Sequence, residues 1–272
     1  MKGCDIKSVN NSKQKVPEKV KEKVPISVVL ISLNEESNIA RALDSVSWAA
    51  DVVVYDSGST DATVDIAKKM GAKVIEGKWL GFGKTKKLAS GHAKFDWVLS
   101  IDCDEELSPE LAAEIAHKLP QLNETLAYRV PRLSNYLGRW IRYGGWYPDL
   151  QSKLFNRKFS NWNEAEIHEK VEAAGYENLV ACLNHYVFKN IEAQVRTNNR
   201  YSSLQAEDMH SKHRKFSWFH FFTKPLVKFV ECYILKRGFL DGYAGFVIAA
   251  NARYSVFLKW AKLRELEMRK SR

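Results

Sequence analysis

Short apolar runs alternate with stretches of helical periodicity over the first half of the chain. The runs are continuous and β-branched, which is typical of strands buried on both faces of a parallel sheet; they cover residues 26–32, 51–55, 73–76 and 97–101. Helices are predicted at residues 39–46, 62–70, 84–93 and from Pro109 onward, the last with Ser108 as its N-cap. This alternation predicts an α/β sheet with right-handed crossovers.

The pattern changes after about residue 125, where Tyr, Trp, Arg and Gly follow one another irregularly. Strands are predicted at residues 126–133 and 151–156, and helical periodicity returns from about Ile191. We therefore divide the chain into a leader at residues 1–24, a sheet domain at 25–190 and a helical, basic and aromatic region at 191–272. The sheet domain has two halves, 25–120 and 121–190.

Composition is that of a folded globular protein, with 45% hydrophobic, 12% aromatic and 27% charged residues. The net charge of +10 favours phosphate-bearing partners. Part of it comes from the first 23 residues, which carry seven lysines and are too polar to bury a core, so disorder is expected there. This leader contains no apolar run, so we expect neither a secretory signal nor a membrane anchor, and a cytoplasmic location.

The cysteines are scattered and show no C-x-x-C spacing; they are Cys4, Cys103, Cys182 and Cys232. Neither a zinc site nor a disulfide framework is indicated.

Polar clusters follow three of the predicted strands. Asn34 and Glu36 follow the first strand, Asp56 and Ser57 the second, and Asp102-Cys-Asp104 the fourth. In an open α/β sheet, ligands bind beyond the carboxyl ends of the strands, so these clusters are expected to meet in one cleft.

The two carboxylates Asp102 and Asp104 are suited to bind a nucleoside diphosphate through a divalent cation. Mg²⁺ or Mn²⁺ prefers oxygen ligands and neutralises charge on a departing diphosphate. We assign the metal to Asp104 and a supporting contact to Asp102, while Asp56 is placed to accept the N3–H of uracil. The alternative is that such acids only stabilise the start of the following helix, but two matched strand ends favour a binding site.

Three segments contain the polar clusters: Ile31-Ser-Leu-Asn-Glu-Glu36, Val54-Tyr-Asp-Ser-Gly-Ser-Thr-Asp61 and Leu99-Ser-Ile-Asp-Cys-Asp-Glu105. In this order they resemble segments of family 2 glycosyltransferases of the GT-A fold. Further segments are similar to bacterial lipopolysaccharide inner-core β-1,4-glucosyltransferases: Trp79-Leu-Gly-Phe-Gly-Lys84, Trp146-Tyr-Pro-Asp149, Ile167-His-Glu169 and Gly238-Phe-Leu-Asp-Gly242. The resemblance covers roughly residues 25–260.

The resemblance implies a GT-A, Rossmann-like mixed sheet flanked by helices, with a helical C-terminal appendage. It also implies an inverting enzyme that transfers glucose from UDP-glucose to a heptose of the inner core or a related lipid-linked saccharide. Residues 25–120 would form the nucleotide-sugar half and 121–190 the acceptor half. Thr85 and Lys87 stand where the family pattern has Gln and Asn, which leaves the donor sugar open. Donor contacts are expected from Asn34, Glu36, Asp56, Ser57, Lys84 and Asp102.

Inversion by single displacement requires a carboxylate that accepts the proton of the acceptor hydroxyl. Glu169 and Asp149 are the two candidates, and we favour Glu169. His168 is a candidate metal ligand through its imidazole, with a structural hydrogen bond as the alternative.

Acceptor contacts are assigned to Trp146, Tyr147 and Arg142. The two aromatic rings can stack on sugar faces, and the arginine can bind phosphates, although core packing and surface solubility are the competing explanations. The aromatic and basic residues from Phe216 onward also fit peripheral contact with the inner face of a membrane, with a helical appendage packed on the core as the alternative.

Two other classes of protein stay open at this point. A sugar-1-phosphate nucleotidyltransferase would carry a Gly-rich phosphate loop after the first strand, where this chain has Ser32-Leu-Asn-Glu-Glu36. A non-enzymatic basic protein could bind anionic membrane or nucleic acid. The acids at the strand ends would repel nucleic acid unless a metal intervened, so no nucleic-acid partner is expected.

Overall fold

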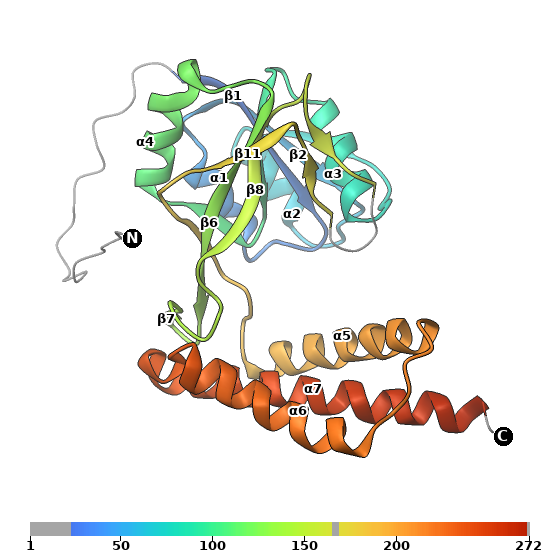
Figure 1. Cartoon of the computed structure of the whole chain (residues 1–272). Helices are drawn as coiled ribbons and strands as arrows, with labels where there is room; N and C mark the ends of the chain where they lie inside the picture. The colour runs from blue at the N-terminus through green and yellow to red at the C-terminus, as the bar shows by residue number, and fades with distance from the viewer. Residues whose placement is uncertain (1–22, 165–168, 271–272) are drawn as a thin grey trace. The chain divides into compact units, whose positions relative to one another are not determined.

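A computed structural model describes residues 23–164 and 169–270 of the chain. The chain forms two compact units (Figure 1). The sheet unit consists of the described residues within Met1–Arg132 and Asp149–His185, and the helical unit of those within Leu133–Pro148 and Tyr186–Arg272.

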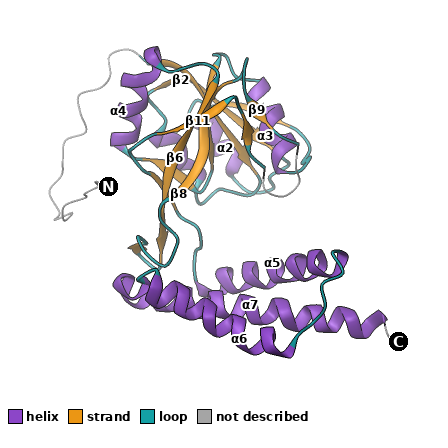
Figure 2. Ribbon diagram, in the orientation of Figure 1, coloured by secondary structure: helices purple, strands orange, loops and turns teal. Residues whose placement is uncertain are grey.

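The parallel part of the sheet carries the first four strands in the order β3-β2-β1-β4. The strands are β1 (Val24–Ser32), β2 (Ala49–Asp56), β3 (Lys73–Glu76) and β4 (Trp97–Asp102). The helices along this part of the chain are α1 (Ile39–Ser45), α2 (Thr63–Lys69), α3 (Phe82–Gly91) and α4 (Pro109–Lys118), with the short 3-10 turn Leu119–Gln121 after α4. The alternation predicted from the sequence is therefore present (Figure 2).

The sheet continues beyond β4 in the order β4-β8-β6-β12-β5, and its β4–β8, β8–β6 and β12–β5 pairs are antiparallel. The additional strands are β5 (Glu105–Leu107), β6 (Leu126–Tyr136), β8 (Asp149–Asn156), β11 (Gly175–Asn178), which pairs parallel with β6, and β12 (Leu183–His185). A separate two-stranded sheet joins β9 (Asn161–Trp162) to β10 (Val171–Glu172). This is the expected mixed sheet flanked by helices.

Helices cover both faces of the parallel strands, which is why those strands are apolar throughout. In β1, Val28 and Leu30 pack with α1, α2 and α4, while Val29 between them packs with α3 on the other face. With both faces buried, polar groups collect at the strand ends.

The helical unit is built on α7 (Gly242–Lys270), against which α5 (Ile191–Ser211) and α6 (Trp218–Val230) pack. Between α6 and α7 lie the π-helical segment Glu231–Leu235 and the 3-10 turn Gly238–Asp241. The unit also includes the short strand β7 (Arg139–Trp140), paired with the end of β6. Among the described residues, no helix is both long and apolar enough to cross a bilayer.

Candidate functional site

The polar clusters lie together at the carboxyl edge of the parallel strands. Strand β1 lies between β2 and β4, with Ser32 opposite Asp56 in one neighbour and Ile31 opposite Asp102 in the other. The convergence expected from the sequence is therefore observed.

Two loops at this edge are joined by reciprocal hydrogen bonds. Asn34, which has a left-handed backbone with φ 56°, donates its N–H to Ser59 Oγ at 2.8 Å and accepts the Thr60 N–H at 2.8 Å. Glu36 donates its N–H to Asp61 and accepts the Ala62 N–H, each at 3.2 Å. The side chains predicted to bind a donor thus also hold the rim of the site in place.

Asp56 is buried, and protein donors surround its carboxylate. Oδ1 accepts the hydroxyls of Ser32 (2.9 Å) and Ser59, and Oδ2 accepts the N–H groups of Gly58 (3.0 Å) and Ser59 (2.8 Å). Burial alone would raise the pKa of Asp56, but these hydrogen bonds outweigh it and hold the pKa below its ordinary value. The adjacent Ser57 Oγ is buried and has no hydrogen-bond partner among the described residues.

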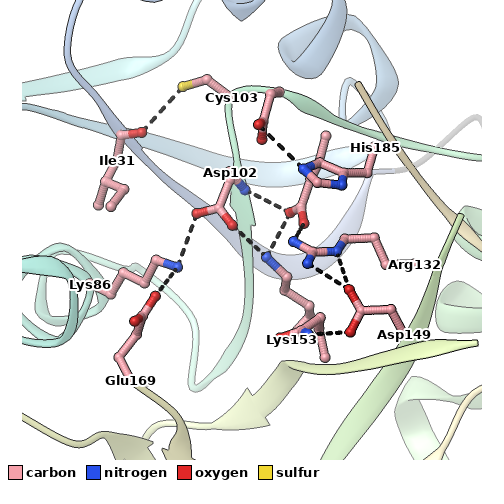
Figure 3. Close-up of polar contacts among 12 residues, drawn as sticks. Ile31, Lys86, Asp102, Cys103, Arg132, Asp149, Lys153, Glu169 and His185 are labelled. Atoms are coloured by element: carbon pink, nitrogen blue, oxygen red, sulfur yellow. Dashed lines mark hydrogen bonds and ion pairs between the residues drawn. The ribbon is translucent and has the colours of Figure 1, made fainter. Parts of the chain in front are cut away.

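Asp102 is clamped between two buried lysines (Figure 3). Its Oδ1 lies 3.0 Å from Lys86 Nζ and its Oδ2 lies 2.8 Å from Lys153 Nζ. Lys86 Nζ also donates to Glu169 Oε1 at 3.2 Å and lies 4.7 Å from the centre of the Trp162 ring. Asp102 and the favoured catalytic base are therefore joined through one ammonium group.

The charges continue on the other side of Asp102. Lys153 donates to Glu105 Oε2 at 2.7 Å, and Glu105 Oε1 lies 3.4 Å from Arg132 Nη1. Arg132 donates from Nε (2.8 Å) and Nη2 (2.6 Å) to Oδ2 of Asp149, its register partner across β6 and β8. Acids and bases thus alternate without a break from Glu169 to Asp149; we call this series the charge ladder (Figure 3).

The ladder fixes the protonation of its central members. Burial would raise the pKa of Asp102, but Lys153 and Lys86 outweigh it and hold the pKa far below its ordinary value. Burial would lower the pKa of Lys153, but Asp102 and Glu105 outweigh it and raise the pKa. In Arg132, Glu105 and Asp149 likewise outweigh burial and raise the pKa. These groups stay charged at neutral pH.

Comparison with known proteins agrees with this geometry. The model of glycosyl transferase family 2 matches residues 27–175. The chain belongs to glycosyltransferase family 2. An uncharacterised glycosyltransferase of Rickettsia typhi is 38% identical to it, covering 90% of this chain and 88% of that protein.

A second relative of this family 2 glycosyltransferase is the lipopolysaccharide core biosynthesis glycosyltransferase LpsC of Rhizobium meliloti, 24% identical over 92% of this chain and 96% of LpsC. Among solved structures, the glucosyl-3-phosphoglycerate synthase of Mycobacterium tuberculosis, in complex with Mn²⁺, UDP and glucosyl-3-phosphoglycerate, matches with a TM-score of 0.35 and 28% identity, covering 41% of this chain and 44% of that one. Family membership confirms the expected GT-A fold and favours the transferase interpretation over the nucleotidyltransferase and the non-enzymatic binding protein.

The surroundings of Asp104 fit a divalent cation. Asp104 Oδ2 lies 3.4 Å from His185 Nε2, and Oδ1 has no hydrogen-bond or ion-pair partner among the described residues. No three His, Cys, Asp or Glu side chains in the described ranges are grouped to hold a metal ion. Mg²⁺ commonly takes one or two carboxylates and completes its shell with phosphates and water, so Asp104 and a donor diphosphate fit it. The predicted ligand His168 lies outside the described residues.

The intervening Cys103 points away from this chemistry. Its thiol donates to Ile31 O at 3.2 Å, and burial, reinforced by nearby carboxylates such as Glu35, raises its pKa well above the ordinary value. The thiol therefore stays protonated and serves the packing of the strand ends.

The remaining predicted residues are not members of the charge ladder. Lys84 is exposed in the first turn of α3. Trp146, Tyr147 and Arg142 belong to the helical unit, where Trp146 packs against Tyr136 with ring centres 5.7 Å apart. The backbone N–H of Arg142 donates to the buried Asp241. Their acceptor role stays a prediction.

Sequence reasoning did not single out Lys153, Glu105 and Arg132. Lys153 precedes the apolar residues Leu154 and Phe155 of a predicted strand, and a lysine inside such a strand signals a buried partner. Glu105 directly follows the carboxylate pair, but its complete burial depends on β5, a strand the sequence pattern does not predict.

Replacement of Lys153 by methionine is expected to destabilise the sheet unit by about 3–5 kcal/mol, because it leaves Asp102 and the fully buried Glu105 without their shared partner. Urea unfolding followed by tryptophan fluorescence measures the loss. The matched control is Lys158→Met, whose exposed ion pair with Asp96 at 2.8 Å is worth less than about 1 kcal/mol. Equal effects of the two substitutions would contradict a structural role for the ladder.

The stability lost in Lys153→Met should depend on pH. The Asp102 pKa lies below that of the unfolded chain, so its contribution is complete above about pH 4 and is lost as the pH falls. The raised Lys153 pKa gives a contribution that is complete below about pH 10 and is lost as the pH rises. Without Lys153 the lowering of the Asp102 pKa is reduced. The difference in stability between wild type and Lys153→Met should therefore narrow on acidification below about pH 4.

Proposed function

We propose that this glycosyltransferase transfers glucose, with inversion, from UDP-glucose to a heptose of a lipopolysaccharide inner core or a related lipid-linked saccharide. The observation that carries the proposal is that Asp56 and the Asp102–Asp104 pair lie at the same edge of the sheet, at the ends of the two strands that flank β1. The acceptor class is supported by the likeness to LpsC along nearly the whole chain and by the motifs shared with inner-core glucosyltransferases.

The donor is assigned to the edge formed by β1, β2 and β4. The uracil N3–H is assigned to the Asp56 carboxylate, where it would take the place of one of the serine hydroxyls. Ser57 offers a buried hydroxyl beside it. Asp102 is assigned to the ribose or the sugar and Lys84 to the diphosphate, for which an ammonium group acts as a point charge.

A divalent cation, Mg²⁺ or Mn²⁺, is assigned to Asp104. When bound with the donor diphosphate it would neutralise the negative charge of the leaving UDP. Asp104 supplies an oxygen ligand, and its contact with His185 orients the carboxylate. Asp102 is a poorer ligand because lysines hold both of its oxygens.

Glu169 is assigned as the base that accepts the proton of the acceptor hydroxyl. Lys86 holds one oxygen of Glu169 and leaves the other for an incoming hydroxyl. Asp149 is less able to accept this proton, because Arg132 donates two hydrogen bonds to one of its oxygens and Gln151 donates one to the other at 2.6 Å. A base must lie within hydrogen-bond reach of the proton it accepts, and a carboxylate with an unengaged oxygen meets this requirement better.

A lipid-linked acceptor places the enzyme at the cytoplasmic face of a membrane, and no nucleic-acid partner is proposed. The acceptor contacts are assigned to Trp146, Tyr147 and Arg142 of the helical unit.

The donor is tested by thermal shift with UDP-glucose, UDP-galactose and GDP-mannose, each with Mg²⁺ and with a chelator. UDP-glucose with Mg²⁺ is expected to stabilise most, by about 2.7 kcal/mol at a hundredfold excess over the dissociation constant. The chelator should reduce this stabilisation. Equal stabilisation by GDP-mannose would refute the uridine assignment, and equal stabilisation by UDP-galactose would refute the assignment of glucose.

A further inference from the structure

Helix α6 carries an apolar face that no described residue covers. Phe219, Phe222, Leu226 and Val230 recur at helical spacing along it, and Val227 lies beside them. Phe219 is 71% exposed, Phe222 61% and Leu226 53%. We call these five residues the α6 face.

The α6 face is not the side through which the helix packs on its neighbours. The opposite side carries Phe221, whose ring lies 5.0 Å from that of Phe257 on α7, and the buried Pro225. A helix that is apolar on both its packed and its exposed side has an unpartnered surface.

Exposed apolar residues also follow α6 along the chain. Ile234 and Leu235 of the π-helical segment are exposed, followed by Phe239, Leu240 and Tyr243 around the start of α7. Leu235 is 73% exposed, so the exposed apolar residues extend beyond a single helix.

Basic residues are interspersed with these apolar residues along the chain. Between residues 215 and 246 the bases are Lys215, Lys224, Lys228, Lys236 and Arg237. The acids there are Glu231 and Asp241. Glu231 pairs with Lys228 at 3.1 Å and with Lys236, and Asp241 is buried against backbone N–H groups. The segment at residues 215–246 therefore combines exposed aromatic and aliphatic side chains with an excess of positive charge.

We propose that the α6 face and the adjoining Ile234–Tyr243 segment bind the headgroup region of an anionic lipid bilayer. Aromatic and aliphatic side chains flanked by lysine and arginine are the composition of an interfacial helix, and anionic lipids attract the basic residues. The 13 residues of α6 are fewer than the roughly 20 needed to span a bilayer. A second copy of the chain is a poorer occupant, because it would bring two positively charged surfaces together.

The test is co-sedimentation of the full chain with vesicles of phosphatidylcholine alone and of phosphatidylcholine with about one-third phosphatidylglycerol. Wild type should bind the anionic vesicles more tightly. The variant Phe219→Gln/Phe222→Gln/Leu226→Gln should lower the partition coefficient by about tenfold or more, with helicity kept because glutamine suits an exposed helix. Its matched control is Tyr201→Gln/Leu204→Gln, at exposed positions of α5, which should bind like wild type.

The lysines of the leader are retained in every variant, so binding through them alone would leave the triple variant as tight as wild type and would overturn the proposal. Equal binding of wild type to both kinds of vesicle would also overturn it. A third outcome would overturn the proposal as well: wild type self-associates in sedimentation velocity, the triple variant does not, and neither binds vesicles. A second copy of the chain would then cover the α6 face. Vesicle binding needs neither donor nor acceptor, so this inference is tested separately from the reaction proposed above.

Discussion

Turnover is expected to fall by about a thousandfold when Asp104 is replaced by asparagine, because a metal at the departing diphosphate contributes several kcal/mol to the transition state. The fold should be retained, since Asp104 is partly exposed and asparagine can still hydrogen-bond to His185. The measurement is the rate of UDP release from the donor in the presence of acceptor and Mg²⁺, together with the melting temperature.

The matched control is Asp96→Asn. Asp96 directly precedes β4 and is partly exposed. The carboxylate pair begins at Asp102, the last residue of β4, about 20 Å away at the rise of an extended chain. This variant should keep wild-type turnover. Full activity of Asp104→Asn would exclude the metal assignment.

Replacement of Glu169 by glutamine should slow the chemical step by about a hundred- to ten-thousandfold, the usual contribution of a general base. Glutamine can still accept the hydrogen bond from Lys86, so the clamp on Asp102 and the affinity for the donor should be kept. Single-turnover kinetics separate the chemical step from binding.

Asp149→Asn is the companion variant. Because Asp149 mainly holds Arg132 in the charge ladder, its loss should lower stability more than it lowers the single-turnover rate of the folded enzyme. The reverse outcome, with Asp149→Asn losing the chemical step and Glu169→Gln retaining it, would transfer the role of base to Asp149.

The parallel strands were the part of the fold that the sequence predicted best, because burial on both faces leaves continuous apolar runs. The run at residues 73–76 matches β3, and β1 starts only two residues before the predicted Ile26. The N-cap of α4 is also confirmed, since Ser108 Oγ accepts the Leu111 N–H at 3.1 Å.

Local capping explains the largest shift among the predicted helices. The helix predicted at residues 84–93 begins at Phe82, because Gly81 has φ 91° and the Thr85 hydroxyl accepts the N–H of Leu80 at 3.1 Å. These contacts depend on the loop conformation rather than on hydrophobic periodicity, so the helical pattern alone did not reveal them.

The charge ladder could be predicted only in part. Asp102 and Glu169 follow from recognisable motifs, but Lys153 and Arg132 join the ladder from β8 and β6, two antiparallel strands that lie later in the chain than β4. Periodicity shows that a strand is buried and does not show which strand it pairs with. The register that sets Arg132 opposite Asp149 therefore became visible only in three dimensions.

We propose that the carboxylate pair at the end of β4 supports metal-assisted, inverting transfer from UDP-glucose. Its most direct test is the reaction of wild-type enzyme with UDP-glucose and a heptose-containing core saccharide, with Mg²⁺ and with chelator, followed by determination of the anomeric configuration of the product. Release of UDP that requires the metal and yields a β-glucoside from the α-linked donor is the predicted result. UDP release that persists in chelator, or an α-glucoside product, would contradict the claim.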